Sequence, residues 1–161
     1  MKKIILALLV LLLVSPVFAA NPKNSLSDLN VYDINGKVVT SKIFEDKEVT
    51  MVNIFTTWCT WCIREMGDIK KLYENLPEGS NIVMICADAY EAPSELIAIV
   101  DAFKLNCTIL KMRSDDLLSY YNLTGYPTTL FVDSEGEIIK EHVGANNYKG
   151  YRAILESLLK R

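Results

Sequence analysis

The chain contains a single histidine among its 161 residues, and its four cysteines include only one closely spaced pair, Cys59 and Cys62. A structural zinc site needs four Cys or His ligands, commonly from two such pairs, so the composition argues against one. Covalent haem attachment needs a histidine directly after a Cys-x-x-Cys pair, and Ile63 stands there instead. These shortages leave redox chemistry or a structural disulfide as the uses of the pair.

An excess of positive charge is also missing. The 17 Lys and Arg residues are outnumbered by 20 Asp and Glu residues, for a net charge of −3. Proteins that bind nucleic acid or anionic lipid usually carry a basic surface. The charge balance therefore gives no reason to expect nucleic acid as a partner.

The one long apolar run lies at the amino terminus. Residues 4–14 are apolar, follow the basic start Met1-Lys2-Lys3, and precede a stretch of small residues that ends at Ala20. This layout predicts a secretory signal peptide over residues 1–19. The run is short for a membrane span of about 20 residues, and an uncleaved membrane anchor is the alternative. The 142 residues at 20–161 suit one domain with a sizeable core.

Beyond residue 20 the sequence has no internal repeat, and its apolar residues alternate between strand and helix spacing. Short β-branched runs predict buried strands, and Asn35-Gly36 between two such runs predicts a hairpin. Strands alternating with helices, followed by a late hairpin, indicate an α/β three-layer sandwich around a mixed sheet. We predict a hairpin over 29–39, strands over 49–55, 81–87, 107–110, 128–132 and 137–143, and helices over 63–76, 94–104 (with Ser94 as N-cap), 114–121 and 148–160.

The cysteine pair falls between the predicted strand 49–55 and a helical pattern, so it should occupy the first turn of the helix. The first four N–H groups of a helix lack intrahelical partners, and the helix dipole is positive there. Both effects stabilise a thiolate and lower the pKa of the thiol below its free value of about 8.5. We expect Cys59 to attack disulfides and Cys62, one turn later, to resolve the mixed disulfide.

Two motifs follow one another along the chain. The first is Trp58-Cys-x-x-Cys62 after an apolar strand, and the second is Gly-Tyr-Pro-Thr-Thr-Leu-Phe-Val-Asp at 125–133, followed by Gly136 and Gly144. Together they resemble thioredoxin-fold proteins of the TlpA/ResA group, over about residues 26–160. The resemblance implies a thioredoxin fold, with a mixed central sheet flanked by helices and, here, an N-terminal β-hairpin extension.

The resemblance also implies a binding surface for clients. Pro127 would be a cis-proline that faces the active-site cysteines, and only about 5–6% of X–Pro bonds in folded proteins are cis. The backbone of Tyr126 would pair with an extended client segment, with Thr128 beside it. Trp58 and Trp61 complete the predicted substrate-binding set, although Trp58 has core packing as an equal alternative.

Glu65, three residues after Cys62, matches an acidic residue that members of the group carry near the active site. A partly buried carboxylate has a raised pKa and can move protons for the resolving thiol; a solvated glutamate is the alternative. Asn53 stands where ordinary thioredoxins carry a buried aspartate, which favours Glu65 as the proton carrier. The chain departs from the group at Trp61 and Met66, where proline is usual, and residues between the cysteines tune the redox potential.

The remaining cysteines and the histidine carry weaker signals. Cys86 and Cys107 belong to two predicted strands, and each is expected as a buried free cysteine or as half of a second disulfide. His142 falls in the late hairpin and is expected at the surface. A copper site would need it near the cysteine pair.

The function predicted from these residues is that of an exported protein-disulfide oxidoreductase without a cofactor or metal, in the periplasm or another extracytoplasmic compartment. The resemblance favours a reductant of client proteins with disulfides, such as apocytochrome c, recharged by a membrane thiol electron donor. One alternative is a thiol peroxidase of the peroxiredoxin type, from Thr56-x-x-Cys59, although Val52 replaces the expected proline. The other is a non-catalytic copper- or client-binding module.

Overall fold

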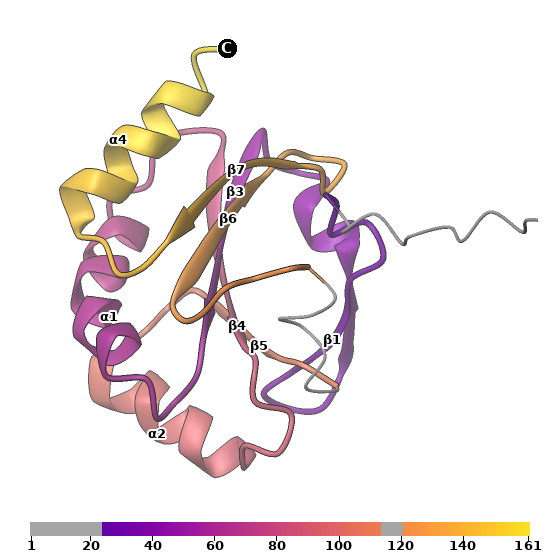
Figure 1. Ribbon diagram of the computed structural model, residues 1–161, viewed down its shortest axis with the longest axis vertical. Helices are drawn as coiled ribbons and strands as arrows, with labels where there is room; N and C mark the ends of the chain where they lie inside the picture. Colours follow the sequence, from indigo (N-terminus) through magenta and orange to yellow (C-terminus); the bar gives the residue numbers. More distant parts are fainter. Residues whose placement is uncertain (1–23, 114–120) are drawn as a thin grey trace, which may run out of the picture.

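A computed structural model describes residues 24–113 and 121–161 of the chain. The signal peptide predicted over 1–19 lies outside these residues, as does all but the last residue of the helix predicted over 114–121. The described residues form a single layer of strands with helices packed against it (Figure 1).

The strands form one mixed sheet in the order β2-β1-β5-β4-β3-β6-β7. The central strands β3, β4 and β5 run parallel, while the pairs at both sides are antiparallel. All seven residues of β3 are buried, as expected for a strand covered on both faces. The strands are β1 (Asn30–Asp33), β2 (Val38–Thr40), β3 (Val49–Phe55), β4 (Ser80–Cys86), β5 (Thr108–Lys111), β6 (Thr128–Val132) and β7 (Ile138–Val143).

Three helices, α1 (Thr60–Tyr73), α2 (Pro93–Phe103) and α4 (Tyr148–Leu158), cover one face of the sheet (Figure 1). In α4, Tyr151, Leu155 and Leu158 recur at helical spacing and are buried in the same core as α1. The opposite face is covered by the short 3-10 helix η1 (Ser41–Phe44), the segment before β1, and residues 121 and 123. This arrangement is the thioredoxin fold that the resemblance implied.

The N-terminal hairpin β1–β2 extends the sheet beyond β5, which confirms the predicted extension. Its turn depends on Asp33, whose Oδ1 accepts hydrogen bonds from the backbone N–H groups of Asn35 and Lys37. Gly36 adopts a φ of +81°, which glycine reaches without a steric penalty. The Asn-Gly signal in the sequence was therefore a reliable guide to this hairpin.

One local expectation, the N-cap of α2, was wrong, and the two alternatives for Cys86 and Cys107 are now decided. Helix α2 has Ala92, and not Ser94, as its N-cap, because Pro93 occupies the first turn with a φ suited to a helix start. Cys86 and Cys107 are both free and buried. Cys86 ends β4 while Cys107 precedes β5, whose register pairs Val83 with Thr108, so the two thiols lie at opposite ends of parallel strands and cannot be bridged.

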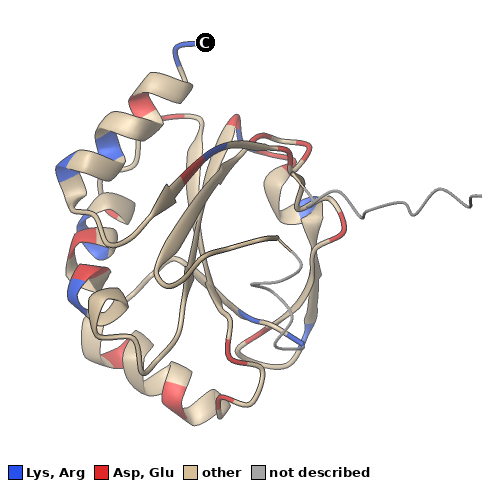
Figure 2. Cartoon of the chain, viewed as in Figure 1, with Lys and Arg blue, Asp and Glu red and all other residues tan. Residues whose placement is uncertain are grey.

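Charged residues of both signs are distributed along the helices and loops, with few on the central strands (Figure 2). Lys70 pairs with Glu74 on α1, and Arg152 pairs with Glu156 on α4, in each case one helical turn apart. Within the described residues, no helix has the length and apolar character needed to cross a membrane.

Candidate active site

The cysteine pair lies where β3 gives way to α1. Cys59 and Cys62 are joined by a disulfide, with their Cα atoms 5.3 Å apart. Cys59 is 8% exposed, whereas Cys62 is only 1% exposed. Both residues are thus largely buried, and Cys59 is the less enclosed of the two.

Cys59 is the N-cap residue of α1. Its backbone is extended, with φ −81° and ψ 106°, and its Sγ accepts a hydrogen bond from the backbone N–H of Cys62 at 3.2 Å. Side chains in this position satisfy one of the unpaired N–H groups of the helix. A negative sulfur at the same position would receive this hydrogen bond and the favourable end of the helix dipole.

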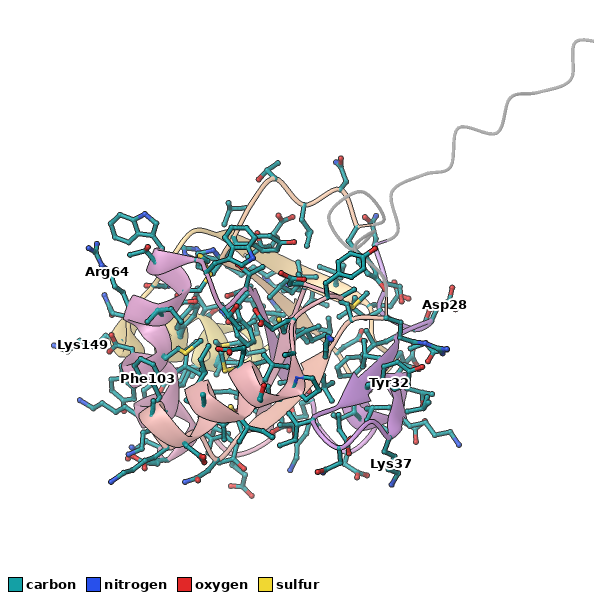
Figure 3. The ribbon with its side chains drawn as sticks, turned by 90° about the horizontal axis from the view of Figure 1, so that it is seen from below. Asp28, Tyr32, Lys37, Arg64, Phe103 and Lys149 are labelled. Carbon is teal, nitrogen blue, oxygen red and sulfur yellow. A yellow bond between two sulfur atoms is a disulfide. The ribbon has the colours of Figure 1, made fainter. Side chains whose placement is uncertain are left out.

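Two tryptophans flank Cys59 in the sequence, and both are exposed. Trp58 is 67% exposed and Trp61 is 59% exposed, so neither is a core residue. The Trp58 indole N–H donates to Asp88 at 3.2 Å, which holds the exposed ring in place. Arg64 extends outward from α1, and its guanidinium lies 4.7 Å from the centre of the Trp61 ring (Figure 3).

The second motif lies beside the first. The Tyr126–Pro127 peptide bond is cis, as the resemblance implied. The Tyr126 ring contacts the Trp58 ring edge-on, with centroids 6.0 Å apart, so the proline loop adjoins the segment that carries Cys59. Thr128 is buried, and its hydroxyl donates to the Gly125 carbonyl at 2.7 Å, which fixes the shape of this loop.

Glu65 is 2% exposed and lies on the same face of α1 as Cys62, one turn further along the helix. Its Oε1 accepts a hydrogen bond from the Asn53 side-chain amide at 2.8 Å. Its Oε2 accepts from the Tyr151 hydroxyl at 2.8 Å and from the Asn146 backbone N–H at 2.9 Å. Four separate parts of the chain therefore meet at one buried carboxyl group.

The environment of Glu65 raises the pKa of its carboxyl group above the ordinary value. Desolvation by burial is the main cause, and the nearby charge of Asp68 adds to it. The three hydrogen bonds from Asn146, Tyr151 and Asn53 oppose this increase but do not cancel it. A raised pKa makes the carboxylate a better proton acceptor, and a solvated glutamate does not fit this burial.

Tyr151 and Thr129 are the members of this cluster that the sequence did not single out, and Asn146 joins them through its backbone. The Thr129 hydroxyl lies 3.1 Å from the Tyr151 hydroxyl and accepts from the Asn53 amide at 3.1 Å. Both side chains are fully buried. The available signal was a tyrosine on the apolar face of α4, where its hydroxyl would need a buried partner.

The remaining candidates are the two free cysteines and the histidine. Burial raises the pKa of each free thiol, Cys86 and Cys107, to about 11. The His142 ring is half-buried and lies edge-on against the Tyr151 ring, with centroids 6.1 Å apart. In the described part of the chain, no group of three or more His, Cys, Asp or Glu side chains could hold a metal ion.

Comparisons with known proteins agree with this geometry. A family profile described as Redoxin matches residues 20–159. The thiol-disulfide oxidoreductase ResA of Halalkalibacterium halodurans is 30% identical over 112 residues, which are 70% of this chain and 62% of that protein. ResA of Bacillus thuringiensis subsp. konkukian is 28% identical over 114 residues, 71% of this chain and 65% of its own length. The chain thus spans somewhat less than two thirds of these relatives.

Solved structures show the same fold. The crystal structure of StoA from Bacillus subtilis matches with a TM-score of 0.67 and 18% identity, covering 81% of this chain and 98% of StoA. An exposed lipoprotein thioredoxin, Etrx1 from Streptococcus pneumoniae, matches with a TM-score of 0.67 and 20% identity, covering 83% of this chain and 99% of that one. Both likenesses extend over almost the whole length of the neighbours.

Proposed function

The chain belongs to the Redoxin family, and from this premise we propose that it is an exported protein-disulfide oxidoreductase that reduces the disulfides of client proteins. The observation that carries the proposal is the Cys59 sulfur at the N-cap of α1, less buried than Cys62 and bonded to it. Relatives named thiol-disulfide oxidoreductase support the same chemistry.

The proposed reaction starts from the reduced dithiol. The Cys59 thiolate attacks one sulfur of the client disulfide, forms a mixed disulfide and displaces the other client sulfur as a thiolate. Cys62 then loses its proton to Glu65, attacks the Cys59 sulfur and releases the second client thiolate. Two electrons pass to the client, and the chain is left with the Cys59–Cys62 disulfide. A thiol donor must then reduce that disulfide for the next cycle, and we assign this role to a membrane thiol carrier.

The exposed tryptophans support binding of an extended client segment. Trp58 and Trp61 flank Cys59 in the sequence and offer exposed apolar surface, and Tyr126 of the cis-proline loop adjoins Trp58. In this proposal the Tyr126 backbone pairs with the client, Pro127 keeps the loop against the cysteines, and Thr128 fixes the loop from within. Clients such as apocytochrome c fit a reductant of this kind.

The proposed location rests on the amino-terminal sequence. A basic start, a short apolar run and small residues before Ala20 favour a signal peptide over 1–19, with the thioredoxin-like domain at 20–161. One structural neighbour, Etrx1 of Streptococcus pneumoniae, is an exposed lipoprotein, and this likeness supports an extracytoplasmic setting.

Reduction of a protein disulfide tests the proposed function. The purified domain, reduced beforehand, should reduce insulin in the presence of a thiol donor, and Cys59→Ser should abolish this activity because no attacking sulfur remains. A Cys86→Ser variant is the matched control, since it removes a buried free thiol. Insulin reduction by Cys59→Ser at the wild-type rate would refute the mechanism.

A further inference from the structure

The hydrogen atoms available on the three partner groups fix which atom donates in each hydrogen bond to Glu65. The Asn53 Nδ2 group has two hydrogens, which it donates to Glu65 and to the Thr129 hydroxyl. Tyr151 donates its single hydrogen to Glu65, so its oxygen must accept from Thr129. The backbone N–H of Asn146 is the third donor, so an ionised Glu65 carboxylate accepts three hydrogen bonds.

A protonated Glu65 needs an acceptor for its own O–H, because an unpaired buried O–H is costly. The amide nitrogen of Asn53 and the backbone N–H of Asn146 can only donate. Of the three donor groups as they stand, only the Tyr151 hydroxyl can also accept, whereas the buried Asn53 Oδ1 would face Glu65 only if the amide turned over and gave up both Nδ2 hydrogen bonds. The Tyr151 hydroxyl can accept because the contact between Thr129 and Tyr151 allows either hydroxyl to be the donor.

We propose that Tyr151 is a positioning residue for the proton transfer, whose hydroxyl donates to Glu65 while the carboxylate is ionised and accepts from Glu65 once it is protonated. This inference rests on the proposed function of Glu65. When the proton of Cys62 arrives at Oε2 of Glu65, the Tyr151 O–H turns from Glu65 to Thr129. No electron moves in this step, and the buried carboxyl group keeps a hydrogen-bond partner in both states.

Among residues 24–113 and 121–161, few other titratable or charged groups lie around this cluster. On α1 they are Cys62, Asp68 and Arg64, and the last two line a surface hollow of about 210 Å³ together with Glu65. β7 contributes His142, whose ring packs on Tyr151 and not on the carboxyl group itself. The partners from β3 and β6, Asn53 and Thr129, are neutral. Tyr151 is thus the titratable group with a direct hydrogen bond to Glu65 from outside α1.

The test compares Tyr151→Phe with Tyr148→Phe, which removes a hydroxyl from the same helix that bonds Arg152 and not Glu65. The readout is the titration of the Glu65 side-chain carboxyl carbon by NMR in the oxidised protein, which requires no activity. Loss of the donor removes a charge-assisted bond from the ionised state and a weaker neutral bond from the protonated state. The Tyr151→Phe midpoint should move to higher pH by about half to one unit, and Tyr148→Phe should coincide with the wild type.

Two further measurements keep the inference falsifiable. Thr129→Val removes the hydroxyl that accepts from Tyr151 once Glu65 is protonated, so it should move the midpoint to lower pH, which provides the test if Tyr151→Phe fails to fold. In a His142→Gln background, the displacement caused by Tyr151→Phe should persist.

An unchanged or lowered midpoint in folded Tyr151→Phe would overturn the inference. A wild-type protein without disulfide reductase activity would overturn the proposed function instead, and the NMR result would still stand. The resolving step, followed as release of a client from its mixed disulfide, should show the same displacement of its pH profile in Tyr151→Phe.

Discussion

Replacing Glu65 by glutamine should change how the stability of the protein depends on pH. Because burial raises the pKa of Glu65 above its ordinary value of 4.5, the folded chain keeps a proton that the unfolded chain loses as the pH rises past that value. The wild type therefore loses stability as the pH increases, until the pH passes the folded pKa. Glutamine has no proton to lose and removes this contribution.

The size of the effect follows from proton linkage. A difference of one bound proton between the folded and unfolded states changes the free energy of unfolding by at most about 1.4 kcal/mol per pH unit. For a domain of this size, that slope corresponds to about 3–6 °C in Tm per pH unit. The amide of glutamine would face the three groups that donate hydrogen bonds to Glu65. Glu65→Gln therefore also lowers the free energy of unfolding by an amount that does not depend on pH.

The assay is urea denaturation of the oxidised wild type and Glu65→Gln, at a series of pH values from about 4 upward. The difference in free energy of unfolding, variant minus wild type, should rise with pH and then level off. Glu74→Gln is the matched control, because this glutamate is the C-cap residue of the same helix and forms a surface pair with Lys70. A difference that stays constant with pH, or falls, would refute the role assigned to Glu65.

Two further predictions concern the cysteines. Cys62→Ser should trap a client on Cys59 as a mixed disulfide, because the resolving sulfur is missing; mass spectrometry of the adduct checks this, and free client alone would count against it. Cys86 and Cys107, with pKa values raised to about 11 by burial, should resist alkylation at pH 8 in the folded protein and react only after denaturation. Rapid labelling of either in the native state would contradict their placement.

The sequence predicted the elements whose signals are local. The buried run of β3, the Asn35-Gly36 turn and the apolar spacing of α1 each depend on neighbouring residues, and each predicted an element that exists. The bounds of the helix were shifted, since α1 spans Thr60–Tyr73 and the prediction was 63–76. The start of α2 was misplaced because two local signals competed. Ser94 is a favourable N-cap residue, but Pro93 before it suits the first helical position.

The part of the site that depends on the spacing of residues along the chain could be predicted from the sequence. The part that depends on tertiary contacts was harder to predict. The Cys59–Cys62 pair could be predicted from its spacing and from its position after a strand. The partners of Glu65 come from β3, α4 and the loop before α4, up to 86 residues away. No local pattern links Tyr151 to Glu65, since their contact exists only after the sheet and both helices have packed together.

The central claim is that the N-terminus of α1 stabilises a thiolate on Cys59. A titration of that thiol tests the claim most directly. The rate at which iodoacetamide alkylates Cys59 in the reduced protein, measured against pH, gives the apparent pKa of the sulfur. We predict a midpoint clearly below the free value of about 8.5. A midpoint at or above that value, or a thiol that does not react at all, would contradict the claim.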